Sequence, residues 1–397
     1  MTALRLMVGV LLCSAYCAAQ DSPPTLTTLY NFGGGDGSNP GGAVVVGSGG
    51  VLYGVTYYGG TNDLGTVFAL TPSALPGGAW TESVLHSFGA YRDGANPDSP
   101  MVIGSGGVLY GSTVYGGNRE DGTVFSLTPP PSPVGQWTEA VLHRFTGDGP
   151  PSGVTISPDG VLYGTTGFGG SSNFGTVYEL APPASPGGAW RMKVLYSFTY
   201  DSGVHPQTGV AIGSGKVLFG TTPSGGAFNC GTIYALAPPA VTGGAWTETL
   251  LYTFTGGADG GMPLASPVIG KGGILYGTTT SGGSSVGGTL FSLTPPVSAG
   301  GSWTYAVLHD FPFPYNAGPL VIGEGGVLYG TGAAGSAFIL QPPTAAGDPW
   351  TYGLLAKFTG SDGYVPMGLT FDGGILYGTT YKAGDYGFGT VFQLARY

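Results

Sequence analysis

An aromatic residue stands directly before a Gly-Gly pair in three successive parts of the chain, at Tyr58, Tyr115 and Phe168. Sugar rings stack on aromatic side chains, and amide or carboxylate groups bind sugar hydroxyls. Polar residues of this kind, with one arginine, follow the three Gly-Gly pairs: Asn62, Asp63, Asn118, Arg119 and Asn173. We therefore take these residues as a candidate binding site for a carbohydrate or an extended peptide. The alternative is that the rings only cover glycine-rich turns.

Acidic residues in the same region allow a catalytic alternative, a carbohydrate-active hydrolase or lyase that uses a carboxylate pair. The acids that could supply the pair are Asp63, Asp93, Asp121, Asp148 and Asp385. No phosphate loop, nucleophile elbow or zinc-protease helix is present in the sequence. We expect a non-catalytic protein without a cofactor, and name no catalytic residue. A third alternative is a structural repeat protein of the cell exterior that binds no small ligand.

Asp-Gly pairs recur along the chain, and a ring of them could hold a cation. They are Asp36-Gly37, Asp93-Gly94, Asp148-Gly149, Asp259-Gly260 and Asp362-Gly363. The local alternative is that each Asp bonds to its own backbone two residues further on while the glycine takes a positive φ. We favour this turn role, because the sequence has no Asp-x-Asp-x-Asp-Gly loop, and we assign no metal site.

Histidine and cysteine are too scattered to predict a metal site. His86, His143 and His309 each stand two residues before a phenylalanine, in a position that other repeats fill with tyrosine. We expect them on separate outer strands, packing as tyrosine would. His205 alone lies in a loop, and one histidine makes no zinc site. Cys230 is expected to be a small buried hydrophobic residue.

The elements that must position these residues come from an internal repeat. The strings GVLYGVT, GVLYGST, GVLYGTT, KVLFGTT, GILYGTT, GVLYGTG and GILYGTT place a leucine at residues 52, 109, 162, 218, 275, 328 and 376. The mean spacing is about 54 residues, close to the length of a four-stranded propeller blade. Each repeat holds four short apolar runs bounded by Gly, Pro, Asn or Asp, as strands are.

The ends of the chain are complementary fragments of one repeat. The run LTTLYNF (26–32) matches a fourth strand, whereas the last repeat stops after its third strand, GTVFQLAR. The sequence therefore predicts an all-β, seven-bladed β-propeller with four-stranded blades, closed by the N-terminal strand completing the last blade. The six tryptophans open the fourth strands of the other repeats, and we expect them to fill the wedges between blades.

The repeated segment FGGGDGSNPGGAVVVGSGGVLYGVTYYGGTNDLGTVFAL (32–70) resembles the GloVer tandem-repeat family, through its F-x-x-x-DG turn, LYGTT strand and GTVF-x-L strand. The resemblance covers about residues 25–396. It implies a secreted or surface-anchored repeat protein and no known catalytic residues. Many such proteins carry a C-terminal sorting anchor. This sequence ends at Tyr397 just past its last strand, which favours a released or periplasmic protein.

The net charge and the N-terminal segment limit which partners and which cellular location we expect for the protein. A net charge of -10 with 11 basic residues argues against nucleic acid as a partner. Residues 1–19 have the pattern of a signal peptide, with Arg5, an apolar run and small residues before a cut near Ala19. We therefore predict a single propeller domain over 20–397, secreted or periplasmic, with no membrane span. Its partner would be a glycan or a protein, and the oligomeric state stays open.

Overall fold

The computed structural model describes residues 24–75, 77–89, 92–132, 135–185, 187–241, 243–298, 300–312, 317–332, 335–345 and 347–395. The predicted signal peptide, residues 1–19, lies outside these ranges. The described chain contains β-strands and five short 3-10 turns. This agrees with the low content of charged helix-forming residues in the sequence.

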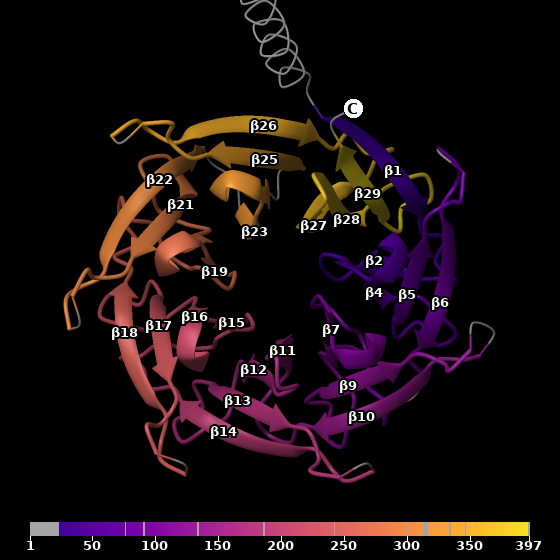
Figure 1. Ribbon diagram of the computed structural model, residues 1–397, viewed down its shortest axis with the longest axis horizontal. Helices are drawn as coiled ribbons and strands as arrows, with labels where there is room; N and C mark the ends of the chain where they lie inside the picture. Colours follow the sequence, from indigo (N-terminus) through magenta and orange to yellow (C-terminus); the bar gives the residue numbers. More distant parts are fainter. Residues whose placement is uncertain are drawn as a thin grey trace, which may run out of the picture.

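Seven antiparallel sheets stand in a ring around an open centre, as Figure 1 shows. The first three blades are β2 (Ser38–Pro40), β3 (Val45–Val46), β4 (Leu52–Tyr58), β5 (Thr66–Thr71), β6 (Thr81–Ser87); β7 (Val102–Ile103), β8 (Leu109–Thr113), β9 (Thr123–Thr128), β10 (Thr138–Arg144); and β11 (Pro151–Ile156), β12 (Leu162–Thr166), β13 (Thr176–Ala181), β14 (Arg191–Ser197). In the first blade, β2 and β3 both pair with β4 and together form the inner strand.

The other four blades repeat this order from the centre outward. They are β15 (Ala211–Ile212), β16 (Leu218–Thr222), β17 (Thr232–Ala237), β18 (Thr247–Thr253); β19 (Val268–Ile269), β20 (Leu275–Thr278), β21 (Val286–Thr294), β22 (Thr304–Pro312); β23 (Ala317–Ile322), β24 (Leu328–Gly332), β25 (Ser336–Gln341), β26 (Thr351–Lys357); and β27 (Tyr364–Asp372), β28 (Ile375–Lys382), β29 (Thr390–Ala395), β1 (Thr25–Asn31). The predicted seven-bladed propeller is confirmed.

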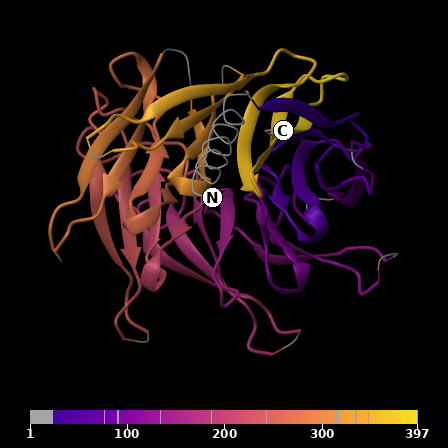
Figure 2. The ribbon, with the colours of Figure 1, turned by 45° about the horizontal axis from the view of Figure 1, so that its top comes forward.

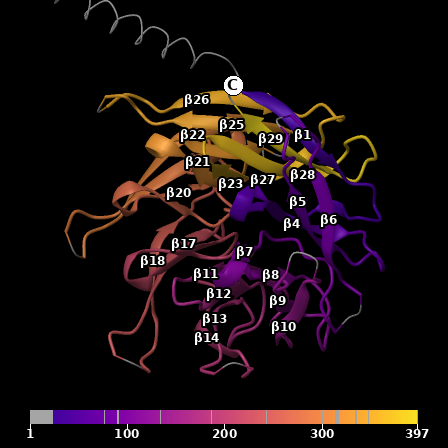
Figure 3. The same cartoon turned by 45° about the vertical axis from the view of Figure 1, so that its right-hand side comes forward.

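The N-terminal strand closes the ring. β1 pairs antiparallel with β29, with Thr25 opposite Ala395 and Asn31 opposite Thr390. Figure 3 shows β1 at the outside of this blade, with β29 and then β28 further in. Phe32, directly after β1, is fully buried, and its amide donates to the carbonyl of Gly389. The last blade is thus built from both ends of the chain, which removes the open edge that β29 would otherwise present.

The glycine of the repeated LYGTT string is fixed by the strand beside it. Gly111 faces Phe125 across the β8–β9 pair, and a Cβ built on Gly111 would lie 2.6 Å from Cζ of the Phe125 ring. Gly277 and Phe291 repeat this arrangement at 2.5 Å. A side chain at either position would displace a ring that is fully buried. The LYGTT strand therefore keeps glycine so that a large ring can fill each blade.

Tryptophans pack between neighbouring blades, as predicted. Each makes an edge contact with the Tyr or Phe that follows the LYGTT leucine of the preceding blade. The ring pairs and their centroid distances are Trp80–Tyr377 6.3 Å, Trp137–Tyr53 5.8 Å, Trp190–Tyr110 5.8 Å, Trp246–Tyr163 6.2 Å, Trp303–Phe219 6.0 Å and Trp350–Tyr276 5.7 Å. These aromatic pairs stabilise the interfaces between blades beyond the area they bury.

The two ends of the strands form two different faces. We call one the loop face: it carries the loops between second and third strands and the loops that link one blade to the next. Ala95 and Tyr115 form a backbone bridge between these two kinds of loop, and Val204 and Ser224 form another. The opposite end, the hairpin face, carries the 3-10 turns and the hairpins between third and fourth strands, which project outward from the ring in Figure 2.

Candidate functional site

Pairs of buried threonines hold the loops that carry the candidate aromatics. The hydroxyls of Thr113 and Thr123 lie 2.9 Å apart, and Thr113 also donates to the carbonyl of Tyr115 at 2.9 Å. In the third blade, Thr166 pairs with Thr176 at 2.8 Å and donates to the carbonyl of Phe168. The same contacts recur at Tyr58. The ends of the second strands are therefore anchored in the core just before each aromatic ring.

The three predicted aromatics lie on the loop face and are exposed to solvent. Tyr58 has 41% of its surface exposed, and Tyr115 and Phe168 each have 46%. Large apolar side chains rarely stay this exposed in neighbouring positions unless a surface has a partner. Further exposed apolar residues lie in loops of the same face or, for Tyr364, at the start of β27: Tyr200, Phe228, Met262, Tyr364, Tyr386 and Phe388. The exposed apolar residues thus extend beyond the three blades identified from the sequence.

Tyr58 and Tyr115 belong to one cluster of phenol rings, joined by Tyr57. The rings of Tyr57 and Tyr58 are 4.6 Å apart at 74°. Burial, together with the neighbouring Tyr115 and Tyr58, raises the pKa of Tyr57 to about 12. Tyr381 of β28 adjoins the cluster: burial and then Tyr58 raise its pKa. The cluster therefore spans the seventh, first and second blades.

Phe168 belongs to a second cluster, over the third and fourth blades. Its ring lies 4.6 Å from the ring of His205, which also approaches Phe174 at 6.5 Å. Phe174 in turn lies 6.3 Å from Tyr200. Phe168 also packs over Gly149 of an Asp-Gly pair. One side of its ring therefore covers a turn, while nearly half of the residue stays exposed to solvent. We name the two clusters together the aromatic arc: Tyr381, Tyr57, Tyr58, Tyr115, Phe168, His205, Phe174 and Tyr200.

The polar candidate residues divide into two groups. Asp63 and Asn173 both adopt a positive φ, and each accepts a hydrogen bond from the first glycine amide of its Gly-Gly pair, at 2.8 and 2.9 Å. One oxygen of each side chain therefore shapes the turn. Asn62, Asn118 and Arg119 are exposed on the loop face. These three lie in the same second-to-third-strand loops as the Gly-Gly pairs that follow Tyr58 and Tyr115.

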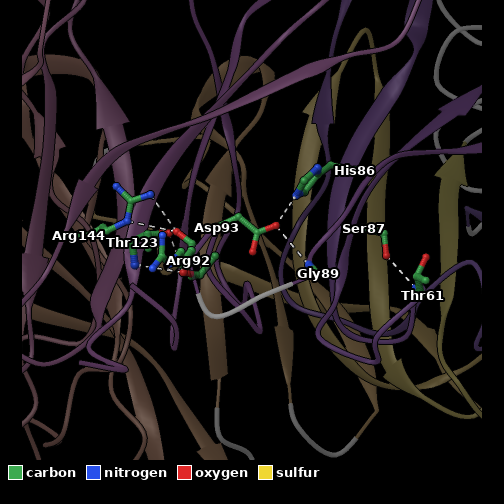
Figure 4. A network of polar contacts seen from close by, with 9 residues as sticks. Thr61, His86, Ser87, Gly89, Arg92, Asp93, Thr123 and Arg144 are labelled. Atoms are coloured by element: carbon green, nitrogen blue, oxygen red, sulfur yellow. Dashed lines mark hydrogen bonds and ion pairs between the residues drawn. The ribbon is translucent and has the colours of Figure 1, made fainter. Parts of the chain in front are cut away.

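Polar contacts fix the loops between the first two blades, as Figure 4 shows. Nε2 of His86 lies 3.5 Å from Oδ2 of Asp93, which also accepts a hydrogen bond from the amide of Gly89. Burial lowers the pKa of His86, and Asp93 offsets part of this effect. Arg144 donates two hydrogen bonds, at 3.2 and 3.0 Å, to the carbonyl of Arg92. The loop between the first and second blades, next to Tyr115, is therefore held by both backbone and side-chain contacts.

The Asp-Gly pairs do form turns, as expected, but the Asp carboxylate bonds to the backbone before it and not to the backbone two residues further on. The carboxylate bonds to an amide three or four residues before it, as Asp36 does with Gly33 and Asp259 does with Thr255. Asp259 also accepts a hydrogen bond from the hydroxyl of Tyr252 at 3.0 Å. The reason is that the preceding strand ends in the tight F-x-x-x-DG turn, whose free amides point back at the acid. The glycines take the expected positive φ.

Four of the five acids considered for catalysis accept hydrogen bonds, three from loop amides and one from the side chain of Asn31 at the end of β1. They are Asp63 from Gly59 N, Asp93 from Gly89 N, Asp121 from Gly147 N and Asp385 from Asn31 Nδ2. Over the described ranges, no group of three or more His, Cys, Asp or Glu side chains could hold a metal ion. The part of the chain that the structure describes also contains no helix with the length and hydrophobicity of a membrane crossing.

The three strand histidines pack against phenylalanine rings, whereas the cysteine lies at the end of a loop. His86, His143 and His309 lie on β6, β10 and β22 of separate blades, and each ring contacts the Phe two residues on. Cys230 was expected to be buried, but it is only half-buried and free. The physical reason is its place at the end of an exposed loop, where Sγ lies 3.3 Å from the carbonyl of Phe228.

A cavity of about 420 Å³ lies at the centre of the ring, where the first strands of all seven blades converge. Its lining is made largely of Gly, Ser, Pro and small apolar residues, with Asp98 as the one charged residue among them. Asp98 also acts electrostatically on Tyr57.

Comparison with known proteins places the repeat in a family. The sequence matches the family described as Gloeobacter/Verrucomicrobia repeat over residues 19–187 and 150–392, nearly the whole chain. The chain belongs to the Gloeobacter/Verrucomicrobia repeat family. The family resemblance seen in the LYGTT and GTVF strings is thereby confirmed. No curated protein matches this family member in sequence.

Solved structures resemble this Gloeobacter/Verrucomicrobia repeat protein in fold. Virginiamycin B lyase from Staphylococcus aureus superposes with a TM-score of 0.57 at 17% identity, covering 94% of this chain and 99% of the lyase. A streptogramin B lyase gives 0.57 at 16% identity, covering 94% and 97%. PorZ, a surface component of the type-IX secretion system of Porphyromonas gingivalis, gives 0.52 at 13% identity, covering 89% and 46%. At these identities the likeness shows the propeller fold alone.

Proposed function

We propose that this protein is a secreted, non-catalytic propeller that binds a carbohydrate through the aromatic arc on its loop face. The observation that carries the proposal is the exposure of Tyr58, Tyr115 and Phe168 in three successive blades, anchored by buried threonine pairs. A rigid row of exposed rings gives the flat surfaces on which sugar rings stack. A protein ligand that presents apolar side chains is the other partner this face could accept.

The polar groups beside the arc support a sugar rather than a purely apolar ligand. Asn62, Asn118 and Arg119 are exposed and can exchange hydrogen bonds with hydroxyl groups. Catalysis is less well supported, because most of the candidate carboxylates already accept hydrogen bonds that shape their loops. A glycosidase needs two carboxyl groups held on either side of the bond that is cleaved.

Affinity electrophoresis in gels cast with neutral and acidic polysaccharides tests the proposal. We expect at least one polysaccharide to retard the wild-type protein, and the variant Tyr58→Ala/Tyr115→Ala/Phe168→Ala to run without retardation. Val241→Ser/Val297→Ser on the hairpin face is the matched control, since both side chains are highly exposed. Equal retardation of the arc variant and the wild type would refute the role of the arc. Product analysis on the retained polysaccharide reports any turnover.

The proposed export depends on the first 19 residues. N-terminal sequencing of the protein recovered from a bacterial host's periplasm or medium checks it. The expected sequence starts at Gln20, directly after the predicted cut. Protein that stays in the cytoplasm with Met1 retained would contradict export.

A further inference from the structure

The interface between the sixth and seventh blades has no tryptophan where the other six interfaces have one. Trp80 lies eight residues before Phe88, and the same count back from Phe32 reaches Pro24. Pro24 lines a cavity of about 280 Å³ between the sixth and seventh blades. The smaller proline ring therefore stands at the place that an indole ring fills elsewhere in the molecule.

The walls of this cavity are those of a tryptophan site. Tyr329 follows the LYGTT leucine of the sixth blade, the position whose rings contact tryptophan at the other interfaces. Here Tyr329 stacks on Phe371 at 5.7 Å and 10°, and Leu376 adds apolar surface. An apolar cavity of about 150 Å³ in a protein core is large enough to bind benzene. The cavity between these blades therefore has room for a fused two-ring system.

The rim carries a carboxylate and a side-chain amide, where the other 3-10 turns begin with Ser or Lys and the other third strands end in Thr or Ala. Glu324 is the only acidic residue in the first turn of the five 3-10 turns of the described chain. Gln341 ends β25, where a threonine or an alanine ends the other third strands. Both side chains are exposed and line the cavity. A carboxylate and an amide oxygen are acceptors for a ring N–H.

We propose that the wedge between the sixth and seventh blades is a binding site for an indole group, which enters ring-first between Tyr329 and Pro24 and donates its N–H to Glu324 or Gln341. The molecule itself shows which ring fits, since it seats an indole edge-on against the corresponding ring at six interfaces. The site lies on the hairpin face and is separate from the aromatic arc.

Fluorine NMR of 5-fluoroindole with the full-length protein tests the site. We expect saturable binding of one equivalent to the wild type and to Pro24→Ala. Pro24→Trp fills the cavity, so it should abolish binding and raise the melting temperature by about 1–2 °C. Trp303→Gly opens the matched wedge between the fourth and fifth blades, and should add a second equivalent. N-acetyl-5-fluorotryptophan amide tests which kind of molecule supplies the indole group. Binding of both probes indicates the tryptophan side chain of a protein or peptide, and binding of 5-fluoroindole alone indicates a free small molecule.

Three results would overturn the inference. The first is no binding of 5-fluoroindole to the wild-type protein. The second is unchanged binding in Pro24→Trp, which would place the ligand elsewhere. The third is binding that appears only after residues 396–397 are removed, which would show that the chain's own end fills the wedge. If Trp303→Gly does not fold, the comparison of Pro24→Ala with Pro24→Trp still decides the question.

Discussion

Replacing Phe32 with alanine measures how much the N-terminal strand contributes to closing the ring. Phe32 is fully buried, and its ring lies 5.0 Å from Phe68 and 5.3 Å from Tyr30. It packs in a cluster with Val44 and Val391, which come from the first blade and from β29. Truncating a buried phenylalanine costs about 3–5 kcal/mol, because the apolar contact is lost and a cavity remains.

The expected change in melting temperature follows from the size of the protein. A chain of 397 residues unfolds with an entropy of about 0.8 kcal/mol/K at its midpoint, so a loss of about 4 kcal/mol lowers the melting temperature by about 5 °C. Differential scanning calorimetry measures this shift. Phe198→Ala is the matched internal control, since Phe198 is equally buried and lies 5.0 Å from Tyr234. Thr25→Ala, at an exposed position of β1, should change stability by less than about 0.5 kcal/mol.

The result that refutes the reasoning is a clear difference between the two phenylalanine variants. If Phe32→Ala lowers the melting temperature by less than about 1 °C while Phe198→Ala lowers it by about 5 °C, then β1 does not complete the seventh blade in solution. Equal shifts mean that the closing strand is as firmly packed as an internal one.

Two further predictions concern the blade interiors. Burial, and then the charge of Asp93, raise the pKa of Glu139 to about 7. Protonated Glu139 therefore contributes most to the free energy of unfolding below the ordinary carboxyl pKa near 4.5, and this contribution is lost as the pH rises through 7. Glu139→Gln should therefore reduce the loss of unfolding free energy between pH 5 and pH 8 by about 1 kcal/mol, once solvent screening of this half-exposed carboxyl is allowed for. That is about 1 °C of melting temperature for a chain of this length, and an unchanged pH dependence would contradict the prediction. Thr113→Val removes the partner of the buried Thr123 hydroxyl and should cost about 1–3 kcal/mol in denaturant unfolding, whereas Thr71→Val at an exposed strand end should cost less than about 0.5 kcal/mol; equal costs would contradict the pairing.

The blade number and the ring closure could be predicted because each rests on a repeated physical constraint. The glycine of LYGTT recurs because a buried ring lies against it, as at Gly111 and Phe125. The matching fragments at the two ends follow from the same four-strand unit. Packing that is repeated seven times leaves a signal in the sequence that one loop cannot leave.

The loop face could be predicted only in part, because its residues are not equivalent from blade to blade. Tyr58 and Tyr115 occupy the same position of the repeat. Tyr57, which interacts with both, occupies a position of the repeat that is valine or glycine in the next two blades. His205 appeared isolated in the sequence, yet it packs between Phe168 and Phe174. Such contacts depend on how adjacent blades are placed, which no single repeat encodes.

The central claim, that the aromatic arc binds a carbohydrate, is tested most directly by a thermal-shift titration with oligosaccharides of the best-retained polysaccharide. A ligand that binds only the folded state at a hundred times its Kd adds about 2.7 kcal/mol of stability, or about 3 °C for a chain of this length. We expect this shift in the wild type and in Val241→Ser/Val297→Ser, and its loss in Tyr58→Ala/Tyr115→Ala/Phe168→Ala. A shift of the same size in the arc variant would contradict the account.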